Sequence, residues 1–78
     1  MHFPSREQIA ALQRQYPGGT KVELLGMDDP QALPMGTMGE ILGIDDAGQL
    51  LVRWETGSSL SLIPGVDFFR IVQKGGKG

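Results

Sequence analysis

The sequence contains no cysteine, and it has one histidine, one tryptophan and one tyrosine among its 78 residues. Without cysteine, neither a disulfide framework nor a thiolate metal site can supplement a small hydrophobic core. No apolar run reaches the roughly eighteen residues that cross a bilayer, and the first residues lack the charged and apolar regions of a secretory signal. We therefore expect a cytoplasmic protein that makes no contact with a membrane.

The side chains that most often carry out catalysis are also scarce. The single histidine, His2, lies near the amino terminus, and Ser58, Ser59 and Ser61 have no evident general base close to them in the sequence. Nucleophilic and general acid–base catalysis both require such a base. The sequence thus predicts a protein that is not an enzyme and has no catalytic residues and no cofactor.

Two pairs of adjacent acids raise the question of a metal site. Asp28 with Asp29, and Asp45 with Asp46, would offer carboxylates to a hard cation if their loops met. Neither segment has the ligand spacing of a calcium loop, and aspartate is a common turn former because it accepts hydrogen bonds from nearby backbone amides. We interpret both pairs as turn residues and predict no bound metal.

The net charge of −2 is unevenly distributed along the chain. Residues 20–72 carry three cations against eight acids, a net charge of −5, whereas the residues on either side carry more cations than acids. Binding to a phosphate backbone depends on clustered lysine and arginine, and residues 20–72 offer no such stripe. Nucleic-acid binding is disfavoured but stays open as an alternative, with the tail and these residues as its contacts: Arg6, Arg14, Lys21, Arg53 and Arg70.

The chain divides into three parts. Residues 1–19 are predicted to form a helix and a linker, because Ser5 and Gln8 have the spacing of a capping box and apolar residues recur on one side of the helix that follows. One apolar stripe of this length is too little for an isolated helix, so we expect it to pack on the rest of the protein or on a second copy. Residues 20–72 form one β-domain, and residues 73–78 form a disordered tail.

Glycine-containing turns divide the β-domain into short strands with alternating apolar residues. The turn after residue 44 is expected to use a positive φ angle at Gly48, and residues 28–36 form the longest loop. An OB-fold would need longer strands and a helix between the third and fourth strands. We predict a mainly β fold, a five-stranded SH3-like barrel preceded by one short N-terminal α-helix, with strands at residues 20–27, 38–44, 49–54, 58–63 and 68–72.

Several sequence phrases, in order along the chain, resemble those of a known family of small bacterial and phage proteins. Two of them are Val52-Arg53-Trp54 and Ile63-Pro64-Gly65-Val66-Asp67. The family is the domain-of-unknown-function family 4314, and the resemblance covers roughly residues 5–72. It implies an SH3-like barrel and an origin in bacterial, phage or mobile-element genomes, and it implies no particular activity. The other phrases are residues 16–24, 27–30, 36–39, 45–48 and 57–60.

The longest loop is the candidate site for a partner, because it is bordered by methionines. Methionine adapts its shape and suits variable protein surfaces, although some of these side chains would equally well plug one end of the barrel. In the alternation of the strand predicted at residues 68–72, Phe68 falls on the face that points to solvent. Trp54 is a candidate platform, although its alternation with Leu50 and Val52 favours burial. The predicted partner-binding residues are Met27, Asp28, Asp29, Leu33, Met35, Met38, Trp54 and Phe68.

These observations favour a non-enzymatic SH3-like binding module, a protein-interaction adaptor of a phage or mobile element. Two alternatives stay open. One is a nucleic-acid-binding barrel, and the other is an oligomer that captures a small nucleotide or metabolite between its barrels, which would suit a chain too small for a pocket of its own. The sequence leaves the identity of the protein partner and the oligomeric state open.

Overall fold

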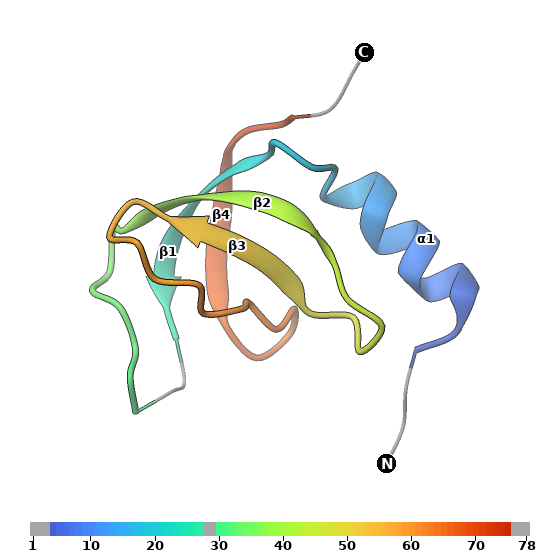
Figure 1. The fold of residues 1–78 in the computed structure, drawn as a ribbon, viewed down its shortest axis with the longest axis horizontal. Helices are drawn as coiled ribbons and strands as arrows, with labels where there is room; N and C mark the ends of the chain where they lie inside the picture. Colours follow the sequence, from blue (N-terminus) through green and yellow to red (C-terminus); the bar gives the residue numbers. More distant parts are fainter. Residues whose placement is uncertain (1–3, 28–29, 76–78) are drawn as a thin grey trace.

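The computed structural model describes residues 4–27 and 30–75. Its strands form one open, antiparallel sheet in the order β3-β2-β1-β4, and the helix stands to one side of this sheet (Figure 1). No helix among the described residues is long and apolar enough to cross a membrane. In chain order the elements are α1 (Arg6–Gln15), β1 (Lys21–Gly26), β2 (Met38–Ile44), β3 (Leu50–Trp54) and β4 (Phe68–Gln73).

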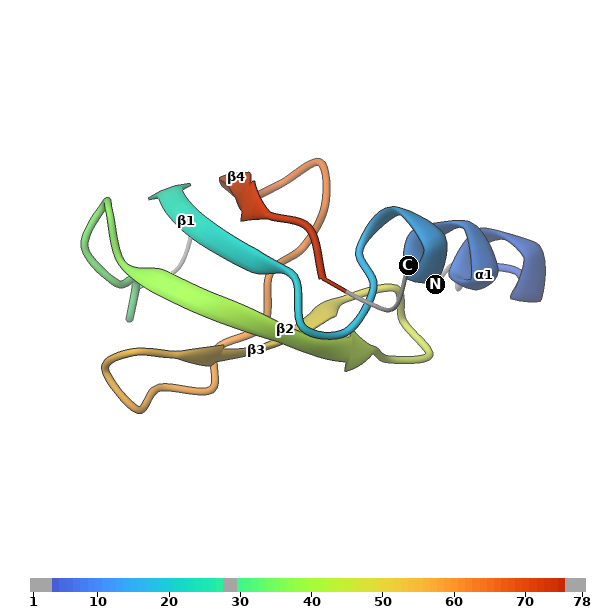
Figure 2. The same cartoon turned by 90° about the horizontal axis from the view of Figure 1, so that it is seen from above.

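Helix α1 begins at the predicted capping box. The Ser5 hydroxyl accepts a hydrogen bond from the backbone N–H of Gln8 at 3.1 Å, and the Gln8 side chain accepts one from the N–H of Ser5 at 2.7 Å. Two N–H groups that the helix itself leaves without acceptors are thereby satisfied. The helix ends where Tyr16 N–H donates to the carbonyl of Leu12. None of its residues is buried, and Figure 2 shows it beside one end of the sheet.

The core lies on one face of the sheet, as the alternation predicted. Seven hydrophobic side chains are buried there, and removing each aliphatic one from water contributes about 1.5–3 kcal/mol. Trp54 is the largest of them, and its indole N–H donates to the carbonyl of Leu60 at 2.8 Å, which satisfies its only polar group. The buried residues are Val22, Leu24, Ile41, Leu50, Val52, Trp54 and Leu62.

The structure does not show the strand that was predicted over residues 58–63. Leu62 forms an isolated bridge to β3 through two backbone hydrogen bonds to Leu50 of 2.8 and 3.0 Å, and the carbonyl of Ser58 accepts one more from Trp54 N–H at 3.2 Å. Earlier in the segment the Ser58 hydroxyl accepts from Leu60 N–H at 3.3 Å, a local bond that competes with ladder pairing. The structure therefore has four strands rather than five, and they form an open sheet. Leu62 still points into the core, as predicted.

The turn between β2 and β3 confirms the predicted role of two residues. Gly48 has a φ angle of 82°, a conformation that glycine adopts readily. One carboxylate oxygen of Asp45 accepts hydrogen bonds from the N–H groups of Ala47 and Gln49, at 3.0 and 2.9 Å. Asp45 is thus a turn-forming residue, as its sequence context indicated.

Candidate functional site

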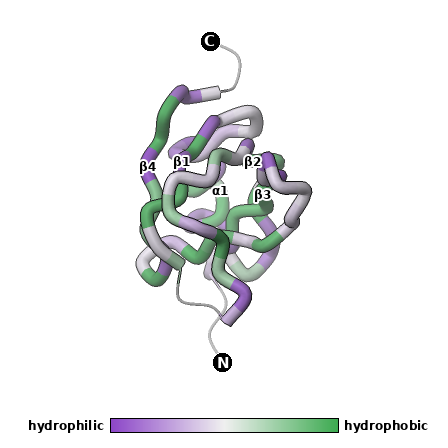
Figure 3. The backbone as a smooth tube through the Cα atoms, turned by 90° about the vertical axis from the view of Figure 1, so that its left-hand side faces the viewer, coloured by the Kyte–Doolittle hydropathy of each residue, from purple (hydrophilic) through white to green (hydrophobic). Residues whose placement is uncertain are grey.

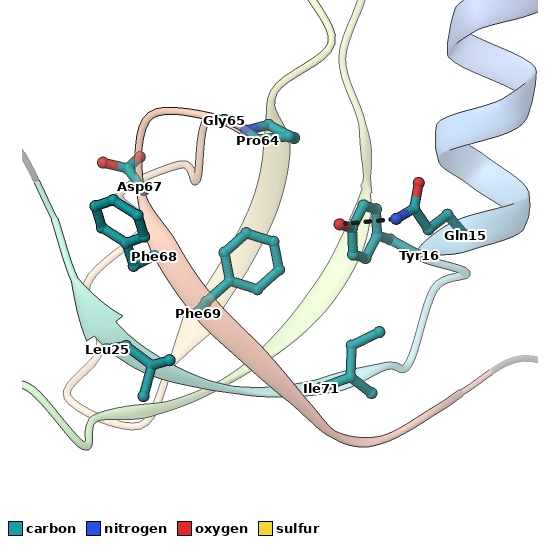
Figure 4. A pocket seen from close by; sticks show the side chains of 9 residues that line it. All are labelled: Gln15, Tyr16, Leu25, Pro64, Gly65, Asp67, Phe68, Phe69 and Ile71. Atoms are coloured by element: carbon teal, nitrogen blue, oxygen red, sulfur yellow. Dashed lines mark hydrogen bonds between the residues drawn. The ribbon is translucent and has the colours of Figure 1, made fainter.

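A groove of about 480 Å³ lies beside β4, between the end of α1 and the turn that precedes β4 (Figure 4). Its walls are mostly apolar, and they come from segments that are far apart in the sequence. Figure 3 shows that β4 consists of hydrophobic stretches interrupted by a hydrophilic one. We call this feature the β4 groove, lined by Gln15, Tyr16, Leu25, Pro64, Gly65, Asp67, Phe68, Phe69 and Ile71.

Two aromatic rings lie next to each other inside the β4 groove. Tyr16, directly after α1, and Phe69, on β4, have ring centroids 5.6 Å apart and ring planes inclined at 55°. Tilted aromatic pairs at this separation are favourable because the edge of one ring meets the face of the other. Both residues also pack against the buried core. The pair therefore connects the end of α1 to the sheet and forms one side of the groove.

Exposed apolar side chains surround this aromatic pair. Phe68 is 68% exposed, Leu25 41% and Ile71 38%. Leu25 occupies a bulge, because Leu24 pairs with Phe69 while Gly26 already pairs with Phe68. Contiguous exposed apolar surface is uncommon on monomeric proteins and marks sites of interaction.

The turn before β4 is held by a buried acid. Asp67 is only 7% exposed, and its carboxylate accepts a hydrogen bond from the backbone N–H of Ile63 at 2.8 Å. The N–H groups of Val66 and Asp67 both donate to the carbonyl of Ile63, at 3.0 and 2.9 Å. These bonds fix the wall of the groove that carries Pro64. The Asp67 carboxylate is a structural acceptor in this arrangement.

The predicted loop residues differ in their exposure. Met35 is 75% exposed, in agreement with a contact role. Met27 and Leu33 are half-buried and pack against the core, which is the alternative that the sequence left open for the loop. Met38 is half-buried on β2.

The other predicted partner-binding residues have different outcomes. Trp54 is 2% exposed and faces the core, so its proposed role as a platform for a partner is wrong; the alternation that favoured burial is confirmed. Phe68 is exposed, as its phase predicted, and it lines the β4 groove. Asp28 and Asp29 lie outside the described residues.

Sequence reasoning missed most of the β4 groove. The apolar stripe of the predicted helix and the strand predicted at residues 68–72 did not indicate that Tyr16, Phe69 and Ile71 line one groove. A signal was present, because a short helix needs an apolar partner and the last strand is apolar on both faces. These patterns do not predict which side chains of the helix and the strand contact each other. The structure shows these contacts.

The outer face of the sheet carries its charges in ion pairs. The Glu40 carboxylate lies 3.0 Å from the guanidinium of Arg53 and 3.7 Å from the ammonium of Lys21. The hydrogen bond from Arg53, followed by the charge of Lys21, lowers the pKa of Glu40 below its usual range. Arg70 lies 2.6 Å from Glu23 in the same way. Each of these three cations thus lies within ion-pair distance of an acid of the same chain, and Lys21 and Arg53 share Glu40.

Metal-binding residues are not brought together in the part of the chain that the structure describes. Over residues 4–27 and 30–75, no group of three or more histidine, cysteine, aspartate or glutamate side chains could hold a metal ion.

The geometry defines a small, mainly β domain with one helix and an apolar surface groove. Comparison with known families assigns this chain: the family described as "Domain of unknown function (DUF4314)" matches residues 5–72. The protein belongs to this family, as the sequence phrases indicated. No curated protein and no solved structure matches the chain.

Proposed function

We propose that this protein is a non-enzymatic interaction module with SH3-like architecture, an adaptor of a phage or mobile element that binds another polypeptide through the β4 groove. One observation carries the proposal: Leu25, Phe68 and Ile71 expose apolar surface around a single groove. Covering these side chains would remove apolar area from water, which is the main driving force of protein association.

The SH3-like part of the proposal draws on the segment after β3. Leu62 lies beside Leu50 and makes two backbone hydrogen bonds to it. If this pairing extended along residues 58–63, the segment would add a fifth strand next to β3. The short strands and tight glycine turns are consistent with such a barrel.

The charges favour a protein partner over a nucleic acid. Lys21 and Arg53 are paired with Glu40, and Arg70 is paired with Glu23. Phosphate binding would have to break these pairs before the cations could release counterions from the nucleic acid. The residues that line the β4 groove include no lysine and no arginine.

The chemistry of the groove favours binding over catalysis. Its lining residues include one carboxylate, Asp67, which already accepts a backbone hydrogen bond, and they include no histidine, cysteine or serine. A nucleophile with an adjacent base is therefore not available among them.

The proposal is tested by comparing three variants in affinity capture from a bacterial host lysate. Captured proteins are identified by mass spectrometry and then titrated against each purified variant. Phe68→Ser removes the most exposed apolar side chain of the groove, whereas Leu42→Ser removes a 55% exposed side chain of β2 that does not line it. Met35→Ser tests the loop that the sequence analysis favoured.

We expect Phe68→Ser to raise the dissociation constant of the captured partner about tenfold or more, a loss of at least roughly 1.4 kcal/mol. Leu42→Ser and Met35→Ser should bind like the unmodified protein. If a captured protein fails to bind Met35→Ser but still binds the other two variants, the binding site lies in the loop. A partner that binds all three variants equally would overturn the assignment to the β4 groove.

A further inference from the structure

Strand β4 is an edge of the sheet, and no described strand pairs with its outer side. The strand order β3-β2-β1-β4 leaves two edges. The β3 edge is covered in part, because Leu50 pairs with Leu62 and Trp54 N–H donates to the carbonyl of Ser58. Strand β4 pairs with β1 alone within the described residues. An open edge of this kind presents a row of hydrogen-bonding groups to any extended chain.

The backbone groups that face this opening can be identified from the neighbouring strand. The N–H of Leu24 donates to Thr37 and its carbonyl accepts from Gly36, at 2.9 and 2.7 Å, so both groups point away from β4. In an antiparallel sheet, two residues that lie directly opposite each other direct their N–H and carbonyl groups either both towards each other or both away from each other. The residue of β4 opposite Leu24 therefore directs its N–H and carbonyl groups away from β1. Phe69 lies opposite Leu24, and Ile71 follows two residues later in the same register. The N–H and carbonyl groups of Phe69 and Ile71 therefore face the open edge.

The side chains of β4 do not protect this edge. Natural edge strands are commonly shielded by lysine, proline or inward-pointing charges. Strand β4 has one charged residue, Arg70, whose guanidinium is held 2.6 Å from Glu23 of the same chain. Ile71 and Val72 are 38% and 44% exposed. The edge is thus apolar and locally neutral.

We propose that a second copy of this chain covers the edge, with the two β4 strands pairing antiparallel about a two-fold axis at Ile71. The inference rests on the proposed function, because it names the partner of the β4 groove. Ile71 of one copy lies opposite Ile71 of the other, and their outward N–H and carbonyl groups bond to each other. Ile71 also lines the groove (Figure 4). In the proposed dimer the Ile71 side chain of the second copy therefore packs at the edge of this groove.

The charged side chains on and next to β4 favour this register over the other registers that a two-fold axis would allow. A two-fold axis at Arg70 would place the two guanidinium groups directly opposite each other, which is unfavourable. An axis at Phe69 would place Ile71 opposite Asp67, a buried turn residue. With the axis at Ile71, Arg70 lies opposite Val72, and the aliphatic stem of the arginine covers the valine.

The charge distribution of the chain also favours a contact at this edge. Residues 20–72 carry a net charge of −5 and the whole chain −2, so contacts between acidic surfaces of two copies are unfavourable. At β4 the Arg70–Glu23 pair leaves no net charge, and the exposed side chains are apolar. The contact is the same patch on both copies, and it therefore closes at two copies without forming a filament.

A single introduced cysteine tests the register, because the chain has none of its own. Opposed residues of a hydrogen-bonded antiparallel pair have Cα atoms about 5.5 Å apart, which suits a disulfide. Ile71→Cys should therefore oxidise to a covalent dimer. The matched control is Leu51→Cys on β3, whose original side chain is 40% exposed, close to the 38% of Ile71. We expect this control to stay monomeric under the same oxidising conditions.

Sedimentation and light scattering test the dimer without a disulfide. The unmodified chain should have twice the mass of 8.4 kDa at millimolar concentration. Ile71→Lys brings two cations together on the axis and should give a monomer with an unchanged far-ultraviolet circular dichroism spectrum. Leu51→Lys should remain a dimer.

The outcomes separate this inference from the proposed function. A monomeric unmodified chain, or a dimer that Ile71→Lys does not dissociate, overturns the pairing of β4 strands. Cross-linking of Ile71→Cys no faster than that of Leu51→Cys overturns it as well. If the chain is monomeric but a captured host protein is lost with Phe68→Ser, the proposed function stands and the second copy is the wrong partner. If no variant affects any binding, both fail.

Discussion

Gly39 and Trp54 lie opposite each other on β2 and β3, so close that no side chain fits between them. A Cβ atom at position 39 would lie 2.6 Å from Cε3 of the indole and 2.7 Å from a methyl group of Val52. The absence of a side chain at Gly39 thus allows the largest residue of the core to pack against the backbone of β2. This contact fixes the position of Trp54 and, through its indole N–H, that of Leu60.

Replacing Gly39 with alanine should destabilise the protein. The added methyl group must displace the indole of Trp54, and such overpacking costs about 1–3 kcal/mol. Urea unfolding followed by circular dichroism measures this loss in the free energy of unfolding. Gly43→Ala is the matched control on the same strand, because a Cβ there would meet no atom within 4 Å. Equal stability of the two variants would show that the Gly39–Trp54 contact is not tight.

The fluorescence of Trp54 should report burial. It is the only tryptophan in the chain and is 2% exposed, so its emission belongs to one environment. We expect blue-shifted emission that acrylamide quenches weakly in the folded protein, and a red shift with strong quenching in urea. Strong quenching before unfolding would contradict the buried position and would reopen Trp54 as a contact residue.

The ion pairs of Glu40 should make stability depend on pH. Hydrogen bonding by Arg53 and the charge of Lys21 lower the pKa of Glu40 in the folded protein below its ordinary value of 4.5. The unfolded chain then binds the proton more readily, so the ionised carboxylate stabilises the fold above the unfolded pKa. This stabilisation is lost as the pH falls through the folded pKa. Glu40→Gln should therefore be less stable than the unmodified protein at neutral pH, with a difference that disappears in acid.

Urea midpoints measured across the acidic range check this dependence. Asp46→Asn serves as the control, because Asp46 is exposed and forms no ion pair within the described residues. A difference between Glu40→Gln and the unmodified protein that persisted at low pH would assign the effect to packing instead of charge.

Asp67→Ala should loosen the turn that leads into β4. The variant leaves the N–H of Ile63 without the carboxylate that accepts its partly buried hydrogen bond, a loss of about 1–3 kcal/mol. Thermal unfolding measures the change. Asp46→Ala, in the exposed turn between β2 and β3, should stay within roughly 0.5 kcal/mol of the unmodified protein. If both variants unfold alike, the hydrogen bond to Ile63 does not hold the turn.

Local sequence patterns were sufficient where the structure depends on neighbouring residues. The capping box of Ser5 and Gln8, the bounds of β2 and the positive φ angle of Gly48 are all confirmed. In each case the deciding interaction lies within a few residues of the chain. The alternation that buries Leu50, Val52 and Trp54 is local in the same sense.

The sequence could not show which segments pair or which side chains meet. Leu60 and Leu62 alternate as in a strand, but an extended segment that packs on a core without pairing has the same pattern. The ring contact between Tyr16 and Phe69 joins residues from opposite ends of the chain, and no local pattern encodes it. The β4 groove depends on that contact, so only the structure could reveal it.

The ion pair between Glu23 and Arg70 joins residues 47 positions apart and marks where β1 meets β4. Bringing such distant residues together lowers the conformational entropy of the chain before any favourable contact between them has formed. The β2–β3 hairpin, by contrast, is closed by a short turn. Its strands can meet early in folding, whereas the β1–β4 pair must wait for the long intervening segment to become ordered. We therefore expect the strand that carries the candidate site to form late, so that mutations in it change the rate of unfolding, measured by stopped-flow fluorescence of Trp54, more than the rate of folding.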